Sequence, residues 1–339
     1  SYSVTGVQTC ALPIFLLNFG AVDWQADIWV NEVKVASHRG GYTPFSINIT
    51  PALSKAKSQT VTVKVWDPTD KSYQPRGKQV DKPQGIWYTS VTGIWQTVWL
   101  EPVETAYITH LNTTPDIDSR SLAVLARLHN PSSGDLVNVQ VLEGGQVIAK
   151  GRAVAGQEVL VSLPHAKLWS PETPYLYDLQ VTVERSGLVI DRVKSYFGMR
   201  KISSKRDANG IVRLQLNNQD YFQFGPLDQG WWPDGLYTAP TDEALAFDII
   251  KTKDLGFNMI RKHVKVEPAR WYFHCDKQGI LVWQDMPSGD TSPRWQTRNY
   301  FNGQEFQRSM ASEENFRREW QEIIDLTYPN PPVVVRVPF

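Results

Sequence analysis

The stretch of sequence that decides the fold runs from Phe222 to Gly289 and reads FQFGPLDQGWWPDGLYTAPTDEALAFDIIKTKDLGFNMIRKHVKVEPARWYFHCDKQGILVWQDMPSG. Short apolar runs that favour strands alternate in it, and in the residues beyond it, with segments of helical periodicity. The pattern predicts strands at 222–225, 257–262, 280–285 and 333–339, and helices at 241–256, 268–279 and 313–328. Apolar strands that alternate with helices indicate a parallel sheet covered on both faces.

The order of these segments predicts the first half of a (β/α)8 TIM barrel over residues 202–339. Thr241, followed by two acidic residues, has the pattern of a helix N-cap. Pro268 and Gly279 stand at the expected start and end of the next helix.

Polar and aromatic side chains stand where the expected strands end. In a β/α barrel this carboxyl end of the strands carries the chemistry. The candidate site residues at these positions are Asp228, Gln229, Trp231, Arg261, His263, Trp283 and Asp285.

Residues 15–201 read as β-strands without helical periodicity. Apolar and polar residues alternate at 26–38, 60–67 and 93–103, with Asn31 and Glu32 at an expected hairpin turn. We expect residues 15–103 to form a jelly-roll-like β-sandwich, incomplete at its N-terminus, with a long polar loop at 67–84. The turn spacing of residues 104–201 predicts an immunoglobulin-like β-sandwich that lacks the two cysteines of antibody domains.

Composition excludes several classes of partner. The formal net charge of the 339 residues is zero, so nothing favours nucleic acid or an anionic membrane surface. The sequence contains no run of about eighteen apolar residues, so it predicts no membrane-spanning helix. The cysteines Cys10 and Cys275 have no metal-ligand spacing, and we expect neither metal nor cofactor. Oligomerisation is not readable from the sequence.

The first residues have an unusual pattern. Residues 4–14, VTGVQTCALPI, look like the translation of a sequencing-library adapter, which makes residues 1–14 an expected artefact. Any signal peptide would then lie further upstream, so the compartment is unknown, with a periplasmic or secreted location favoured.

Five motifs in order resemble family 2 of the glycoside hydrolases, which includes β-galactosidases, β-glucuronidases and β-mannosidases. The resemblance covers residues 15–339 and rests on WVNEVKVASHRGGYTPFSINITPAL, GIWQTVWLEPV, LWSPETPYLYDLQVTV, YFGMRKI and GFNMIRKHVKVEPARWYFHCDKQGILVWQDM. The segment YPNPPVVVRVPF departs from the Tyr-Asn-His-Pro run usual in the family, either through read error or through divergence.

The resemblance implies a retaining β-glycosidase that hydrolyses terminal β-linked sugars. It places the acid/base and nucleophilic Glu residues beyond Phe339, so the chain as printed is expected to be an inactive fragment. Arg261 would support the ionised nucleophile, and the other six candidates would bind the carbohydrate substrate. The alternative is a non-catalytic carbohydrate-binding or adhesion protein built from β-sandwiches.

Three residues keep two interpretations each. Asp285 would either bind sugar hydroxyls or accept an ion pair from Arg261. The indole of Trp231 needs cover, which either a neighbouring domain or a stacked sugar would supply. Asp67 would either reach the barrel mouth from the sandwich loop or serve as a turn residue before Pro68.

Overall fold

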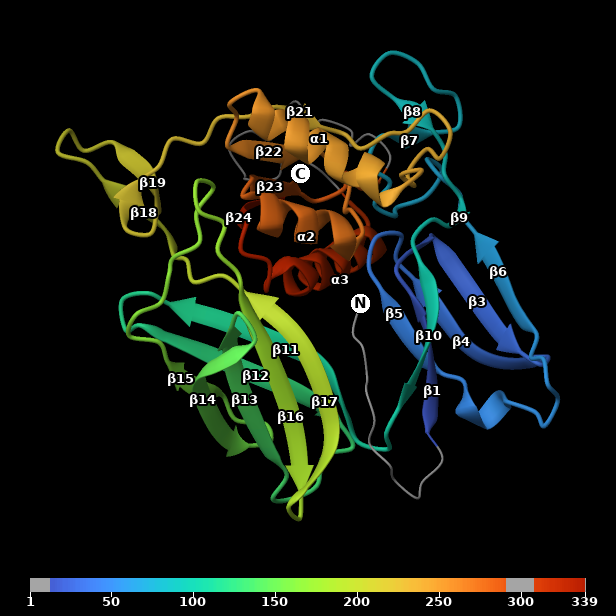
Figure 1. Ribbon diagram of the computed structural model, residues 1–339. Coiled ribbons are helices and arrows are strands. Elements are labelled where there is room, and N and C mark those ends of the chain that lie inside the picture. The colour runs from blue at the N-terminus through green and yellow to red at the C-terminus, as the bar shows by residue number, and fades with distance from the viewer. Residues whose placement is uncertain (1–12, 291–307, 339) are drawn as a thin grey trace.

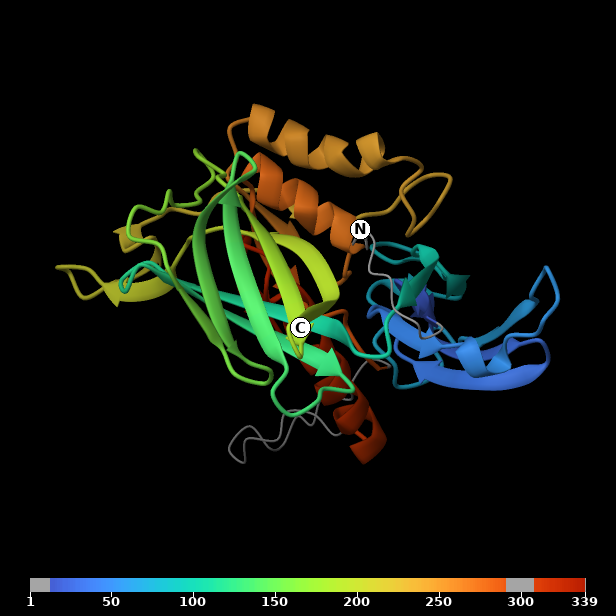
Figure 2. The same ribbon diagram turned by 60° about the horizontal axis from the view of Figure 1, so that its bottom comes forward.

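The computed structural model describes residues 13–290 and 308–338. Figure 1 shows two groups of β-strands, at the lower left and at the right, and above them a region of helices and short strands. The turned view of Figure 2 also keeps the two strand groups apart. None of the helices in these residues is both long and apolar enough to cross a bilayer.

The first sandwich has two antiparallel sheets, with the strand orders β10-β1-β5 and β4-β3-β6. Their strands are β1 (Ile14–Phe19), β3 (Gln25–Val30), β4 (Val33–Arg39), β5 (Phe45–Asn48), β6 (Val61–Trp66) and β10 (Val98–Val103). Alternation along β3 buries Ala26, Ile28 and Val30 in the core. Asn31 and Glu32 have positive φ values of 48° and 69°, which confirms the expected hairpin turn.

Short elements join these strands. They are β2 (Val22–Asp23), η1 (Thr50–Ala52), β7 (Gln79–Val80), β8 (Tyr88–Thr89) and β9 (Gly93–Ile94). The two-residue strands pair as β2-β9 and β7-β8. The Tyr88 ring of β8 stacks on Trp231 of the C-terminal region.

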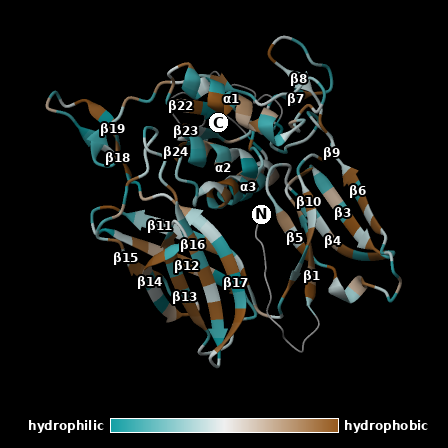
Figure 3. Cartoon of the chain, in the orientation of Figure 1, coloured by the Kyte–Doolittle hydropathy of each residue, from teal (hydrophilic) through white to brown (hydrophobic). Residues whose placement is uncertain are grey.

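The middle sandwich has its own core. One sheet has the order β11-β12-β15 and the other β14-β13-β16-β17. The strands are β11 (Tyr107–Asp116), β12 (Ser121–His129), β13 (Leu136–Glu143), β14 (Gln146–Val154), β15 (Val159–Ser162), β16 (Tyr177–Arg185) and β17 (Leu188–Phe197). Apolar and polar residues alternate along several of them (Figure 3), which sends Val124, Val139 and Val181 between the sheets.

The C-terminal region begins with a small projecting sheet and continues with a parallel one (Figure 1). The small sheet has β18 (Ile202–Arg206), β19 (Val212–Leu216) and β20 (Gln219–Asp220). The parallel sheet has the order β21 (Leu227–Asp228), β22 (Met259–Lys262), β23 (Leu281–Asp285) and β24 (Val333–Val337). Its helices are α1 (Asp242–Asp254), α2 (Ala269–Gln278) and α3 (Met310–Thr327). The expected class, β-sandwiches followed by an α/β barrel region, is therefore confirmed.

The predicted helix ends are present. The Thr241 hydroxyl accepts a hydrogen bond from the Ala244 amide, and Gly279 ends α2 in the left-handed conformation. Ile260, Val282 and Val333 pack against these helices in one buried cluster. The opposite face of the sheet begins with Met259 and Leu281, which pack on Trp169 of the middle sandwich.

The prediction of a strand at 222–225 is wrong, because the first parallel strand is Leu227–Asp228. Phe222 and Phe224 are 83% and 57% exposed, so they do not behave as buried strand residues. The chain still runs beside β22 here, since a Cβ on Gly225 would lie 1.6 Å from the Met259 carbonyl oxygen. Pro226 has no N–H to donate, which delays the regular ladder until Leu227.

A loop of the first sandwich docks beside the carboxyl ends of the parallel strands. Its residue Pro75 forms an antiparallel bridge with Gly289. The amides of Arg76 and Gly77 both donate to the Ser288 carbonyl, at 2.8 and 3.1 Å. Gly77 has a φ of +61°, and a Cβ there would lie 2.5 Å from the Val264 carbonyl oxygen, so only glycine fits.

We propose 15–103, 104–201 and 202–339 as the domain boundaries. The interpretation of residues 4–14 as adapter, including Cys10, concerns positions that lie outside the described residues except for Pro13 and Ile14.

Candidate functional site

Alternation along the parallel strands places three polar candidates on the face of the sheet away from the helices. Ile260 and Val282 pack on the helices. Arg261 follows Ile260 and pairs in register with Trp283, so the side chains of Arg261 and Trp283 take the other face. Asp285 lies two residues beyond Trp283, on the same face.

Asp285 joins Arg261 and His263. Its side chain is 0% exposed, and its two oxygens accept hydrogen bonds from Arg261 Nε at 2.9 and 3.2 Å. His263 Nδ1 lies 2.7 Å from Asp285 Oδ2. The Arg261 side chain keeps 33% exposure, so its guanidinium is held by the carboxylate and yet reaches the surface of this face. Charge-assisted bonds of this kind fix orientation as well as adding stability.

Of the two interpretations of Asp285, the ion pair with Arg261 is thus present in the structure. Its use as a sugar ligand stays a prediction. Trp283 lies on the same face and donates its indole N–H to Gln223 Oε1, while its ring packs near Trp169 and Met259.

The structure does not bring the Asp228 carboxylate to this cluster. Asp228 pairs in register with Lys262, which points to the helix side, and its Oδ2 accepts from Lys262 Nζ at 2.7 Å. Only its backbone reaches the cluster, where the Asp228 carbonyl accepts from the His263 amide at 2.8 Å. A role of the Asp228 side chain in substrate binding therefore stays a prediction.

Gln229 and Trp231 lie in the loop that follows β21. Gln229 Oε1 is buried and accepts no hydrogen bond from residues 13–290 or 308–338. The Trp231 ring stacks on Tyr88 of the first sandwich, with centroids 4.5 Å apart and planes 20° apart, and it also contacts Tyr237. A neighbouring domain thus covers one side of this indole.

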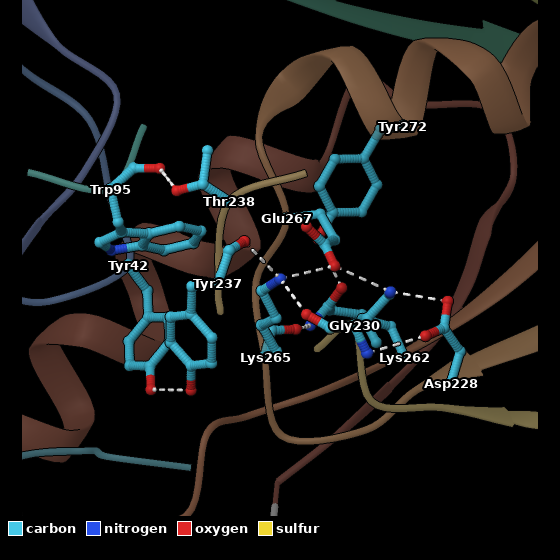
Figure 4. A network of polar contacts seen from close by, with 11 residues as sticks. Tyr42, Trp95, Asp228, Gly230, Tyr237, Thr238, Lys262, Lys265, Glu267 and Tyr272 are labelled. Carbon is cyan, nitrogen blue, oxygen red and sulfur yellow. Dashed lines mark hydrogen bonds and ion pairs between the residues drawn. The ribbon is translucent and has the colours of Figure 1, made fainter. Parts of the chain in front are cut away.

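Sequence reasoning missed a buried ionic cluster beneath the same loop (Figure 4). Lys262 Nζ contacts both Asp228 and Glu267, and it lies 4.4 Å from the centre of the Trp271 ring. Burial disfavours the Lys262 charge, but the two carboxylates outweigh it, so the pKa of Lys262 is raised. The signal available was the alternation of charged residues in KHVKVEP, between a buried strand and a helix.

Asp67 is a turn residue, as its second interpretation has it. Its Oδ1 accepts from the Thr69 amide at 2.8 Å and from Gln74 Nε2 at 3.2 Å. The loop reaches the mouth of the sheet through Pro75 to Gly77 instead. Within the described ranges, no group of three or more His, Cys, Asp or Glu residues is arranged to hold a metal ion.

Comparison with known proteins points to one family. The family model "Glycosyl hydrolases family 2" matches residues 106–200. A β-galactosidase of Thermoanaerobacterium thermosulfurigenes is 25% identical over 327 residues, covering 91% of this chain and 42% of its own. The β-glucuronidase of Rattus norvegicus is 27% identical over 295 residues, covering 80% of this chain and 44% of its own.

A solved structure of the β-glucuronidase from Ruminococcus gnavus in complex with D-glucuronic acid has the same fold. Its TM-score is 0.76 at 17% identity, covering 96% of this chain and 54% of its own. The chain spans between 25% and 44% of the length of the curated relatives compared with it. The resemblance to family 2 of the glycosyl hydrolases that the sequence motifs carry is thereby confirmed.

Proposed function

We propose that the protein carrying this chain is a retaining β-glycosidase that acts on a terminal β-linked sugar. One observation carries the proposal: Arg261 and His263 are held by the buried Asp285 at the carboxyl end of parallel strands. Chemistry in β/α barrels takes place at that end. The names of the relatives, β-galactosidases and β-glucuronidases, support the same reaction class.

In this proposal Arg261 acts on the nucleophile. A retaining mechanism needs a nucleophilic carboxylate and an acid/base carboxyl about 5–5.5 Å apart. A guanidinium within about 4–6 Å of the nucleophile lowers the pKa of that carboxyl and keeps it ionised. Asp285, which is bound from two sides, fixes the plane of the guanidinium and is not itself the nucleophile.

The remaining candidates would contact the sugar. Gln229 offers a buried amide oxygen to a hydroxyl, and the rings of Trp231 and Trp283 offer apolar faces to the C–H surface of a pyranose. His263 would donate or accept a hydrogen bond at the reacting end. Asp228 would contribute either directly or by holding the loop.

Kinetics on the product of the complete reading frame test the proposal. We expect it to hydrolyse at least one of the nitrophenyl β-galactoside, β-glucuronide and β-mannoside, with the β-anomer released first in the NMR spectrum. Arg261→Lys should lower kcat, whereas Arg213→Lys, a change at a half-exposed arginine of β19, should not. Absence of turnover on all three, or release of the α-anomer, would refute the proposal.

A further inference from the structure

The loop between β21 and α1 is closed by a single buried ammonium group. Lys265 Nζ donates to the Gly230 carbonyl at 2.6 Å and to the Tyr237 carbonyl at 2.9 Å. These two residues stand at opposite ends of the segment 230–237, so one side chain ties the ends together (Figure 4). The Lys265 side chain is 1% exposed.

The third N–H of Lys265 points to Glu267. The ammonium lies 3.0 Å from Glu267 Oε1, so its three donors have three acceptors. Burial lowers the pKa of Lys265, and the Glu267 charge opposes this shift. Glu267 Oε1 also accepts from Lys262 at 2.9 Å, and Lys262 in turn holds Asp228, the residue at the foot of the loop. Two lysines and two carboxylates balance in charge, which is what such burial requires.

The loop is also held tightly where it touches this cluster. Gly230 has a φ of +65°, and a Cβ there would lie 2.3 Å from Glu267 Oε1 and 3.0 Å from Lys265 Nζ. Inside the segment, Trp232 and Leu236 exchange backbone hydrogen bonds of 2.8 and 3.1 Å. The segment is therefore a small closed ring. Two charged side chains hold its first residue, since Asp228 Oδ1 accepts from the Gly230 amide at 2.9 Å, but of these two Lys265 alone also binds its last residue, Tyr237.

The ring lies next to residues that the proposed function uses. Gln229 precedes it, with a buried amide oxygen that lacks a partner within the described part of the chain. Trp231 is the second residue of the ring, and its indole stacks on Tyr88. Gln229 and Trp231 flank Gly230, the first residue of the ring, so the positions of both side chains depend on how Gly230 is held.

We propose that Lys265 is a positioning residue for substrate binding, which clamps segment 230–237 so that Gln229 and Trp231 form one wall of a pyranoside pocket. The proposal rests on the proposed glycosidase function for its substrate, but not for the clamp itself. Lys265 touches no substrate: it acts through the two carbonyls that it binds.

Hydrogen exchange and kinetics of Lys265→Met test the two halves separately, both on the product of the complete reading frame. A matched control is Lys253→Met. Lys253 also bridges two carbonyls, those of Pro171 and Gln278, and neither of these residues belongs to segment 230–237. A second variant, Lys265→Met/Glu267→Gln, removes the clamp without leaving an unpaired charge.

We expect the Trp232 and Leu236 amides to exchange at least about tenfold faster in both Lys265 variants and at the wild-type rate in Lys253→Met. We further expect KM for the nitrophenyl glycoside to rise about tenfold in the Lys265 variants, with kcat changed less than about threefold. A merely structural lysine would instead lower the amount of active enzyme and leave KM unchanged.

Unchanged exchange in both Lys265 variants would overturn the clamp, whatever the activity. Faster exchange with an unchanged KM would overturn the positioning role while leaving glycosidase function intact. If the wild type hydrolyses no glycoside, the proposed function fails and the substrate half of this inference fails with it, while the exchange rates still decide the clamp.

Discussion

Replacing Lys262 with methionine should destabilise the C-terminal region more than any change at a surface lysine. The Lys262 side chain is 1% exposed, and its ammonium lies 2.7 Å from Asp228 Oδ2 and 2.9 Å from Glu267 Oε1. Methionine fills a similar volume beside the Trp271 ring, so the loss is electrostatic. It leaves Lys265 as the one lysine beside the buried Glu267 and the partly buried Asp228.

Removing one partner of a buried ion pair costs about 3–5 kcal/mol, since the remaining charge is unpaired. At about 2–4 °C per kcal/mol for a region of this size, the melting temperature should fall by roughly 6–20 °C. Scanning calorimetry measures it, and the middle sandwich, which has a separate core, provides an internal transition that should not move.

Two variants control this prediction. Lys251→Met removes a half-exposed lysine that pairs with Asp254, and it should change stability by less than about 0.5 kcal/mol. Lys262→Met/Asp228→Asn removes one positive and one negative charge, so it should recover about 0.5–3 kcal/mol of the single-variant loss. A Lys262→Met melting temperature equal to that of Lys251→Met would refute the electrostatic reasoning.

Three further outcomes follow from the structure. Arg261→Lys in the product of the complete reading frame should lower kcat at least about tenfold, because arginine binds Asp285 through Nε and keeps two further nitrogens to turn outward, whereas lysine has a single nitrogen; steady-state kinetics with an unchanged kcat would make the arginine structural. Burial raises the pKa of Asp276 to about 7, so the folded state favours its neutral form, and its contribution to stability is lost as pH rises from about 4 to 7. Asp276→Asn should therefore raise the melting temperature at pH 8 and not at pH 4, and an equal effect at both would contradict this sign. Residues 104–200 expressed alone should fold, because their core lies within them, and a spectrum without amide dispersion would disprove it.

Local signals in the sequence were sufficient for the secondary structure of most segments. The Thr241 cap, the Gly279 stop and the Asn31–Glu32 turn each depend on a few neighbouring residues, and each is present in the structure. The prediction of a strand at 222–225 was wrong because the conformation of these residues depends on β22, which is distant in sequence. Gly225 and Pro226 look compatible with an apolar strand until β22 is placed beside them.

The candidate site was predictable in its location but not in its pairings. The position of Asp285 at a strand end follows from the pattern, whereas its contacts with Arg261 and His263 need the register of β22 against β23. Lys262 was missed because lysine is ordinarily exposed, and nothing local shows that Asp228 and Glu267 approach it. The cover of Trp231 by Tyr88 likewise depends on how two distant segments meet.

The contact of residues 75–77 with residues 288–289 limits which parts of this chain can be exchanged with those of a relative by recombination. Each sandwich has a core of its own, so recombination between relatives could in principle exchange them as cassettes. A crossover anywhere between the two contacting segments, however, joins a loop from one parent to a docking segment from the other. Such a hybrid keeps the contact only if its first parent also has glycine at the position of Gly77, where a Cβ would meet the Val264 carbonyl. Parents that lack this glycine can therefore be set aside by inspecting that single residue before any hybrid is made.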